Sequence, residues 1–476
     1  MKKISAVLLI AVLASGLVFA GFSGSAKVGF GADFDKKEFG FIGNGTSVTV
    51  DVKFFEELGG AKSEGDIYAE INGTLYLGFS TAAEDPSQVK ESGKSSPYIT
   101  AKITDAKVGG ENWYVSLLGA AAPKDFAKSS IDSYTTKEKG AVKSNGDPAN
   151  ENNWKYKKAK ATSDASYNLG YDGDNTTPGI EASYADYVVG AALKGSFADD
   201  AAKPDMLGYF YTPEYELADG FTLQAGLAGF KQSAVYSGTS STKKAIGGSL
   251  KFGYTSDSLT ASVASDLGYD FVAEKFGVDV LAKVAYAPVT LELYYKNLPT
   301  SYEYFGKKQT DYRAKRYYAG ANLLSAKLVT DLASFDVPVK ITVTGKDLVQ
   351  AQDIDAEVAV DAMEGLTLTV KGGYQFKSVD NTSDNLPEAV YTDKKEWNAG
   401  LGVSYSYDDL FTAKVAGIVK GTDVISTIGV KASVESSSII PGATLKLDWS
   451  NADGDEVNLY KGAEYGTLMA SCKIAF

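Results

Sequence analysis

The chain has 476 residues and a net charge of −13, with no histidine and a single cysteine, Cys472. Such an acidic chain will not seek nucleic-acid phosphates. Without histidine it lacks the commonest general base and metal ligand, together with every Ser-His or Cys-His catalytic pair. One cysteine cannot form an internal disulfide, so the fold must be held by something other than crosslinks. We therefore expect no enzyme, no cofactor, no metal centre and no nucleic-acid partner.

Residues 1–20 have the pattern of a cleaved export signal. Two lysines precede an apolar run from Ile4 to Ala20, which ends in a sequence suited to cleavage. The alternative is a membrane anchor, but the run is shorter than the roughly 20 apolar residues of a spanning helix, and no stop-transfer pattern follows. Loss of Lys2 and Lys3 would bring the net charge to −15. Residues 21–476 are predicted to form a single domain.

Beyond residue 20, apolar side chains recur at every second position in long segments, which is the period of a β-strand. In residues 67–79 a hairpin turn at Asn72-Gly73 is an alternative, but it would pair apolar with polar residues on every rung. One long strand is therefore preferred. Similar segments run over 259–271 and 278–286, and others begin at Val289, Asp353, Gly365, Glu396 and Asp423.

The length of these segments favours a membrane barrel. We count about 23 candidates, mostly of roughly eight to thirteen residues, whereas globular strands average about five or six and tilted membrane strands need about nine to eleven. Charged residues occupy the opposite parity, so one face is wet: Asp279, Lys283, Glu292, Lys296, Asp355, Glu357, Asp361, Lys446 and Asp448. A soluble antiparallel sandwich has the same alternation, but strand length, the export signal and the aromatic chain end favour an all-β transmembrane antiparallel barrel. Because bacterial barrels have an even number of strands, we expect about 18–22.

The connections between these strands come in two sizes, as in outer-membrane barrels, which have short periplasmic turns and long external loops. Short ones are predicted at Gly109-Gly110, 256–258, Ala287-Pro288, 363–365 and Asp408-Asp409. Long ones are predicted near 80–97, 122–163, 231–244, 298–316, 377–396 and 451–463.

The chain ends on "LMASCKIAF", in which Leu468, Ala470, Cys472, Ile474 and Phe476 alternate with other residues. A closed sheet explains this ending, because its last strand must pair with its first, and "SGSAKVGFGADF" (23–34) is the natural partner. The ending also resembles the C-terminal signature of bacterial outer-membrane proteins, which implies that these five residues are read by the barrel assembly machinery. Cys472 is expected to be a lipid-facing residue rather than a nucleophile.

A narrower resemblance rests on three features: the start "GFSGSAKVGFGADFDKKEFGF" (21–41), the Tyr-, Lys- and Gly-rich strands, and the terminal aromatic residue. Together these features resemble the major surface (outer sheath) proteins of treponemes, within the wider class of outer-membrane porins. The resemblance implies an abundant surface antigen with porin activity and adhesion to host matrix. It contains no short motif from which a site residue could be carried over.

Two basic loops and several acidic groups are candidate sites. The insert 122–163 contains nine lysines, and a second loop holds Lys307, Lys308, Lys315 and the only two arginines, Arg313 and Arg316. Either loop could fold into the pore as a constriction or attract an acidic host polymer, although a solvated external loop is the simplest interpretation. The pair Asp355 and Glu357 is expected to line the lumen rather than to catalyse. "NADGDE" (451–456) and "DGDN" (172–175) lack the spacing of a calcium loop, and turn chemistry explains them.

The expected function is a porin-like channel for passive diffusion of small hydrophilic solutes across the bacterial outer membrane. A barrel of this size is too wide for its own side chains to fill, and its net acidity suggests a mild preference for cations. Strand signal begins close to the predicted cleavage site, so no folded plug is expected. The alternative is a surface adhesin or structural protein whose loops bind host matrix. Outer-membrane lipid and the assembly machinery are expected partners, and a homo-oligomer is compatible with either function.

Overall fold

The alternating segments form strands in the computed structural model, and nearly all of them belong to one sheet. The structure describes residues 22–35, 37–41, 47–57, 67–80, 96–118, 121, 123–139, 154–160, 179–194, 205–236, 239–271, 274–297, 322–346, 348–349, 352–380, 390–392, 395–422, 426–451 and 465–475. Residues 1–20 lie outside this part of the chain, so the export signal stays a prediction. No helix among the described residues is long and apolar enough to cross a bilayer.

The first half of the chain contributes these strands: β1 (Phe22–Asp33), β2 (Glu38–Phe41), β3 (Ser47–Glu57), β4 (Tyr68–Ser80), β5 (Ser96–Gly109), β6 (Trp113–Leu118), β7 (Asp132–Lys139), β8 (Trp154–Lys160), β9 (Gly179–Tyr184), β10 (Tyr187–Lys194), β11 (Asp205–Tyr211), β12 (Tyr215–Ala218), β13 (Phe221–Tyr236) and β14 (Thr239–Thr255). Asn72-Gly73 lies inside β4, as predicted, and it marks a register shift against β5 instead of a turn.

The second half contributes β15 (Leu259–Asp270), β16 (Lys275–Tyr286), β17 (Val289–Asn297), β18 (Asn322–Asp331), the 3-10 helix η3 (Leu332–Phe335), β19 (Val339–Lys346), β20 (Asp353–Met363), β21 (Leu366–Gln375), β22 (Ser378–Asp380), β23 (Val390–Thr392), β24 (Glu396–Tyr407), β25 (Phe411–Thr422), β26 (Ser426–Ile440), β27 (Ala443–Ser450) and β28 (Thr467–Ala475). The segments predicted from the alternation in residues 259–440 fall within this set, each within a few residues of its expected start.

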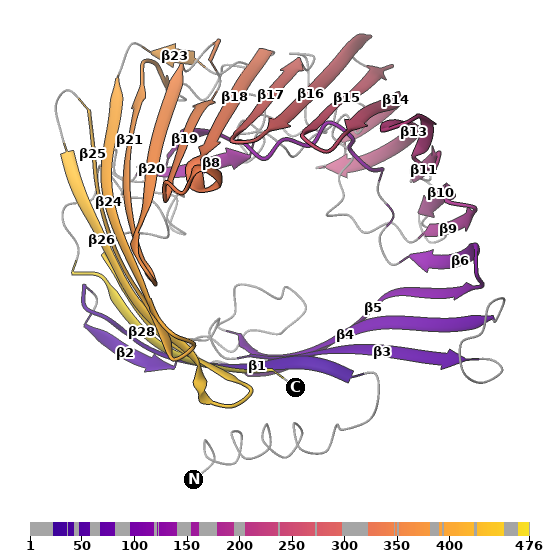
Figure 1. Cartoon of the computed structure of the whole chain (residues 1–476). Helices are drawn as coiled ribbons and strands as arrows, with labels where there is room; N and C mark the ends of the chain where they lie inside the picture. The colour runs from indigo at the N-terminus through magenta and orange to yellow at the C-terminus, as the bar shows by residue number, and fades with distance from the viewer. Residues whose placement is uncertain are drawn as a thin grey trace.

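Twenty-four strands form one antiparallel sheet that closes on itself, so the fold is a barrel (Figure 1). β2 and β3 pair with the same edge of β1, and β11 and β12 pair with the same edge of β13. The 24 strands therefore fill 22 positions around the ring, an even number at the upper end of the predicted range. In the insert 122–163, β7 and β8 pair with each other and are not members of the ring.

The pairing of β28 with β1 closes the ring, as the chain end predicted. The two alternating apolar sets face each other directly in a register that runs from Ser25↔Ala475 to Asp33↔Thr467, with Ala26↔Ile474, Val28↔Cys472, Phe30↔Ala470 and Ala32↔Leu468. Closure leaves neither terminal strand with an open edge, which a membrane-spanning sheet requires. Phe476 lies outside the described residues.

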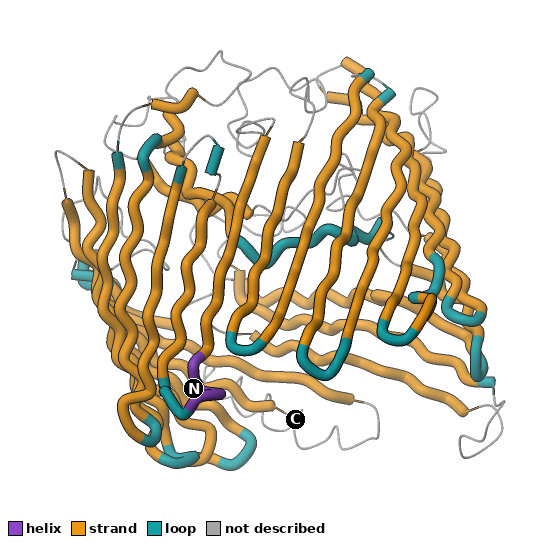
Figure 2. Tube along the Cα trace, turned by 45° about the horizontal axis from the view of Figure 1, so that its top comes forward, coloured by secondary structure: helices purple, strands orange, loops and turns teal. Residues whose placement is uncertain are grey.

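Short turns gather at one end of the barrel, together with the start of β1 and the end of β28 (Figure 2). Gly220, Gly365 and Gly442 have positive φ values at three of them, a conformation in which a Cβ would be strained. We call this the turn end and the opposite end the loop end. One expected loop is wrong: residues 231–244 continue β13 and β14, paired from Lys231↔Lys244 to Tyr236↔Thr239. Their polar composition suggested a loop, but polar residues can also occupy a hairpin that projects beyond the bilayer into water.

The outer surface of the barrel is apolar, and two aromatic clusters mark its limits. At the loop end of β15 and β16, Tyr269 packs against Phe276, with ring centroids 4.7 Å apart, and at the turn end Tyr286 is exposed. Phe276 and Tyr286 are ten positions apart in the sequence. At about 3.4 Å per residue and a tilt of about 40°, these residues span roughly 26 Å along the barrel axis, close to the ~25 Å apolar band of outer-membrane barrels.

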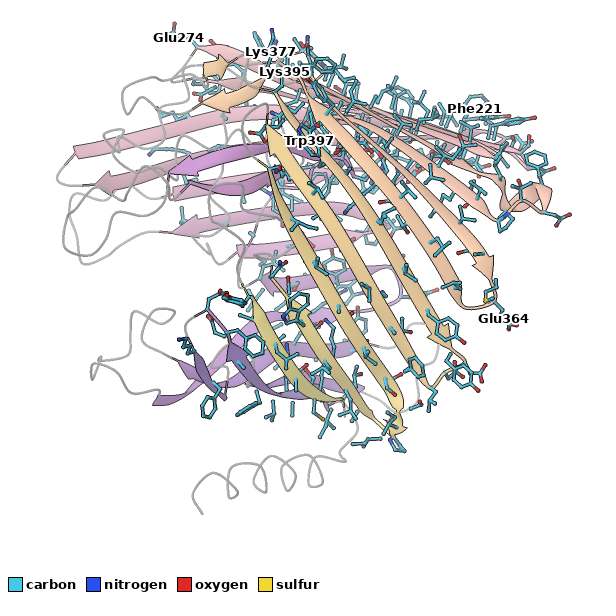
Figure 3. All side chains as sticks on the ribbon, turned by 90° about the vertical axis from the view of Figure 1, so that its left-hand side faces the viewer. Phe221, Glu274, Glu364, Lys377, Lys395 and Trp397 are labelled. Carbon is cyan, nitrogen blue, oxygen red and sulfur yellow. The ribbon has the colours of Figure 1, made fainter. Side chains whose placement is uncertain are left out.

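Other aromatic pairs repeat the two clusters around the ring. Phe221 packs against Tyr254 at the turn end with the two rings tilted, and Tyr374 packs against Phe376 at the loop end. Figure 3 shows charged residues beyond these girdles, with Glu364 at the turn end and Lys377 at the loop end. Aromatic girdles flanked by charge are typical of a bilayer boundary. Hydrocarbon therefore faces the apolar side of the strands.

This assignment predicts a sided response to charge. We expect Leu401→Lys, on the outer face of β24, to lower the free energy of unfolding from lipid vesicles by about 2–4 kcal/mol, because the ammonium would enter hydrocarbon. Leu401 is 67% exposed. The control is Ser404→Lys, on the inner parity of the same strand, which should change stability little. Equal losses in urea titrations of both variants would contradict the assignment.

Candidate functional site

The inner face of the barrel carries the charged residues that the sequence placed on the wet parity. Lys283 lies opposite Glu292 on the next strand, at 3.4 Å, and Glu292 lies opposite Lys327 on β18. The same rung continues through Thr344, Asp355, Gly373, Asn398 and Lys420. Charges of both signs thus line the interior from β16 to β25.

A stretch of chain that follows β6 folds inward and lies along this inner face. Residues 123–131, here called the lumenal segment, cross the inside of the wall formed by β13 to β18 on their way to β7 (Figure 2). The sequence analysis considered the insert 122–163 as a pore constriction but favoured a solvated external loop. The external-loop interpretation is wrong for residues 123–131. Ala127 and Ile131 in this segment are buried.

Apolar packing holds the first part of the lumenal segment. Phe126 packs on a buried cluster whose members face inward from β10, β11, β13 and β14: Ala192, Leu207, Tyr209, Tyr211, Ala228, Phe230 and Ala245, together with Ala121. Its ring lies 5.9 Å from that of Tyr211. Gly226 makes this possible, because a Cβ there would stand 2.9 Å from the Tyr211 ring. Burying these side chains against the segment removes apolar surface from lumenal water.

Two carboxylates of the wall bind the segment by hydrogen bonds. Asp266 on β15 accepts from the backbone N–H groups of Phe126 and Ala127, at 3.0 and 2.8 Å. Glu292 on β17 accepts from the Ser129 hydroxyl at 2.6 Å and from the Ser130 amide and hydroxyl at 2.7 and 2.9 Å. Bonds to ionised acceptors are among the stronger ones, and they offset the cost of burying the carboxylates. These hydrogen bonds to Asp266 and Glu292, here called the clasp, hold the segment at two points.

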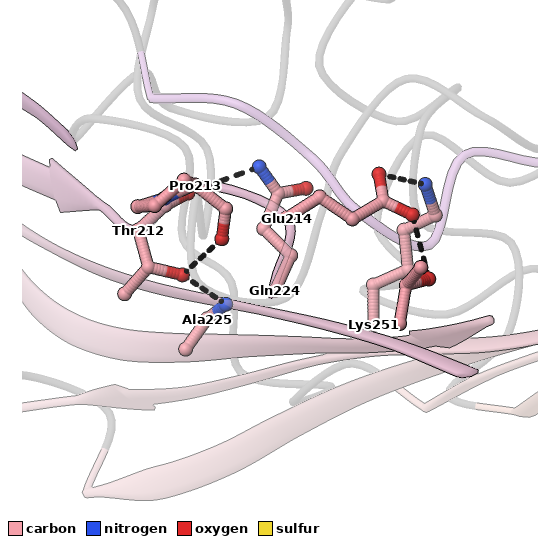
Figure 4. A network of polar contacts seen from close by, with 7 residues as sticks. Thr212, Pro213, Glu214, Gln224, Ala225 and Lys251 are labelled. Carbon is pink, nitrogen blue, oxygen red and sulfur yellow. Dashed lines mark hydrogen bonds and ion pairs between the residues drawn. The ribbon is translucent and has the colours of Figure 1, made fainter. Parts of the chain in front are cut away.

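Two further polar networks brace the wall next to the segment. Glu181 on β9 accepts from the hydroxyls of Tyr114 and Tyr209, each at 2.6 Å, which ties β6, β9 and β11 together. Between β11 and β12, the Thr212 hydroxyl accepts from the Ala225 amide at 2.9 Å (Figure 4).

In the same network, Glu214 accepts from Thr222 at 2.7 Å and from Lys251 at 3.3 Å. Where residues 212–214 interrupt the strand, the Thr212 hydroxyl gives the Ala225 amide an acceptor, and Glu214 links side chains of β13 and β14. Polar groups of the wall therefore keep hydrogen-bond partners at the interruption.

A polar pocket of about 520 Å³ remains between the end of the lumenal segment and the opposite wall. Ser130 and Ile131 form one side, and β18 to β25 form the other. Its ionisable lining comprises Lys327, Lys340, Lys346, Lys371, Lys420, Asp353, Asp355, Glu357 and Glu396. Lys346 pairs with Asp355 and lies 3.9 Å from Asp353, while Asn398 donates to Asp355 at 3.3 Å.

The sequence-predicted site residues have different outcomes. Lys307, Lys308, Arg313, Lys315 and Arg316 lie outside the described residues, as do residues 172–175 and most of 451–456. Asn451, which is described, accepts from the Val430 amide at 2.6 Å. Leu468, Ala470, Cys472 and Ile474 take part in ring closure, but recognition by the assembly machinery stays a prediction. Where side chains are placed, no group of three His, Cys, Asp or Glu residues is suited to a metal ion.

The predicted lumen residues Asp279, Glu292, Asp355 and Glu357 do lie on the inner parity. Sequence reasoning missed Ser129 and Ser130, which donate to Glu292, and it missed Asp266, which accepts from the Phe126 and Ala127 amides. The signal was Phe126 and Ile131, which are out of place in a solvated loop.

No protein-family model matches the chain, and no curated protein matches it in sequence. Similar solved structures include the translocation pore of the P pilus usher PapC, with 8% identity over 96% of this chain and 99% of that chain and a TM-score of 0.38. The ferric enterobactin receptor PfeA of Pseudomonas aeruginosa has 9% identity over 96% and 81%, with a TM-score of 0.48. OprD of Pseudomonas aeruginosa has 12% identity over 96% and 94%, with a TM-score of 0.35. These likenesses assign neither a solute nor an activity to this chain.

The clasp predicts that two hydroxyls hold the lumenal segment against the wall. In Ser129→Ala combined with Ser130→Ala, we expect amide exchange at Phe126, Ala127 and Ser130 to accelerate by about tenfold or more, because one bond to a charged group contributes ~1.5–3 kcal/mol. Hydrogen exchange of the lipid-reconstituted barrel measures this. The control, Ser404→Ala, alters an inner-face serine outside the clasp, and unchanged exchange in the double variant would mean that packing alone fixes the segment.

Proposed function

We propose that the chain is a porin-like channel that lets small hydrophilic solutes diffuse passively across the bacterial outer membrane. The observation that carries this proposal is the polar pocket of about 520 Å³ inside a closed ring of 22 strand positions. A ring of this size is too wide for its own side chains to fill. The lumenal segment lies inside this ring, and the pocket lies beside its last residues, Ser130 and Ile131.

The inner face suits such passage because charges of opposite sign alternate along its rungs. Glu357 lies opposite Lys371, and Lys283 lies opposite Glu292. The exposed groups Glu357 and Lys371 keep the lumen hydrated, while the lumenal segment covers Glu292 and narrows the lumen at mid-barrel. Diffusion down a gradient would need no energy source and no chemical step.

The orientation and partners belong to the same proposal. An even number of strand positions puts the start of β1 and the end of β28 at the same end, the turn end, which in this orientation faces the periplasm. The loop end would then face the cell surface. Three parts of the proposal rest on the sequence patterns given above. They are the export signal, recognition of the chain end by the assembly machinery, and the resemblance to treponemal major surface proteins. A homo-oligomer and adhesion through the surface loops are compatible with this arrangement.

The experiment is conductance in a planar bilayer with a matched pair of variants. We expect discrete current steps from the purified protein, lowered in Thr344→Trp, because this side chain faces the pocket. Val343→Trp, one residue earlier on the outer face of β19, should leave the steps unchanged. A silent bilayer with a correctly folded barrel and retained binding to host matrix proteins would instead favour the adhesin.

A further inference from the structure

Three carboxylates of the inner wall, on β15 to β17, are withdrawn from lumenal water. Asp266, Asp279 and Glu292 are 0%, 1% and 6% exposed, although all three have the inner parity of their strands. The lumenal segment covers Asp266 and Glu292 with its own N–H and O–H donors. Asp279 accepts from the buried hydroxyl of Tyr294 at 3.3 Å. A solute in the lumen therefore does not meet these carboxylates directly.

The carboxylates of the polar pocket are also largely withdrawn. Asp353 and Glu396 are buried, and Asp355 accepts from Lys346 and Asn398. Glu357 is the exposed carboxylate of the pocket lining. It lies directly opposite Lys371 on the neighbouring strand.

Three lysines of the pocket face the open volume more fully. Lys371 and Lys340 are exposed and Lys327 is half-buried. Lys340 pairs with Asp331 at 3.7 Å, but both side chains are about half exposed, and such pairs contribute little. Set against Glu357, these lysines give the accessible part of the pocket an excess of positive charge. This sign is opposite to the net charge of the chain.

We infer that the pocket at Lys327, Lys340 and Lys371 binds small anionic solutes, so that the channel prefers anions. The inference rests on the proposed channel function and adds the class of solute to it. Ammonium groups in a narrow lumen with low-dielectric walls concentrate anions and raise the barrier for cations. The local lining, and not the net charge of −13, then decides selectivity.

The lumenal segment contributes to this selectivity through what it covers. Its donors hold Asp266 and Glu292 out of the aqueous path, which leaves the lysines as the accessible charges. Displacing the segment would return two carboxylates to the lumen. It would also widen the channel, so size and charge selectivity would change together.

The first test is the reversal potential across a KCl gradient. We expect chloride to be more permeant than potassium in the wild-type protein, and Lys327→Gln combined with Lys371→Gln to lower this ratio by roughly twofold or more. The control Lys414→Gln, an exposed inner-parity lysine outside the pocket, should change it less. Potassium preference in the wild type, or equal effects of pocket and control variants, would overturn the inference. The absence of any current step would overturn the channel function itself.

A second test identifies the anion and the role of the cover. Succinate and inorganic phosphate are added separately, and reduction of the chloride current by either one supports the pocket and shows whether it takes carboxylates or phosphates. If neither reduces the current, the binding site is refuted. Ser129→Ala combined with Ser130→Ala should shift the reversal potential towards potassium. An unchanged potential, with exchange data showing a loosened segment, would refute the covering role.

Discussion

In hydrocarbon an unpaired backbone N–H or C=O group costs several kcal/mol, so a membrane-crossing sheet must have no open edge. The pairing of β1 with β28 satisfies this requirement, and the rest of the structure depends on it. It brings residues more than 430 positions apart into register and sets the start of β1 and the end of β28 at the turn end. It also creates an interior, because a ring of 22 positions encloses more space than inward side chains occupy.

That interior is shaped by a second, weaker set of interactions. A short stretch after β6 turns inward because the wall beneath it offers an apolar cluster around Tyr211 and two acceptors, Asp266 and Glu292. The segment and the wall supply each other's hydrogen-bond partners. Without these bonds the segment's amides would lack acceptors and the carboxylates would be buried without donors. The barrel wall and its inward segment therefore form one packed unit, and the remaining pocket is what this packing leaves open.

Strand positions, ring closure and the facing of charges could be predicted from the sequence, because each depends on a local period of two. For residues 259–271 this alternation alone was enough to predict the strand. The continuation of the hairpin through 231–244 could not be recognised from the sequence. Beyond the bilayer, polar residues can form paired strands as readily as loops. The clasp could not be predicted either, because Ser130 and Glu292 are separated by 162 residues and no local pattern links them.

Cys472 gives the ring an internal reporter. It is the only thiol in the chain, it lies opposite Val28 at the junction of the last strand with the first, and its neighbours of the same parity face the lipid. A polarity-sensitive dye attached there would sense the moment at which this junction enters the bilayer. Entry of this junction into a bilayer can thus be followed in real time on the native sequence, without an engineered labelling position.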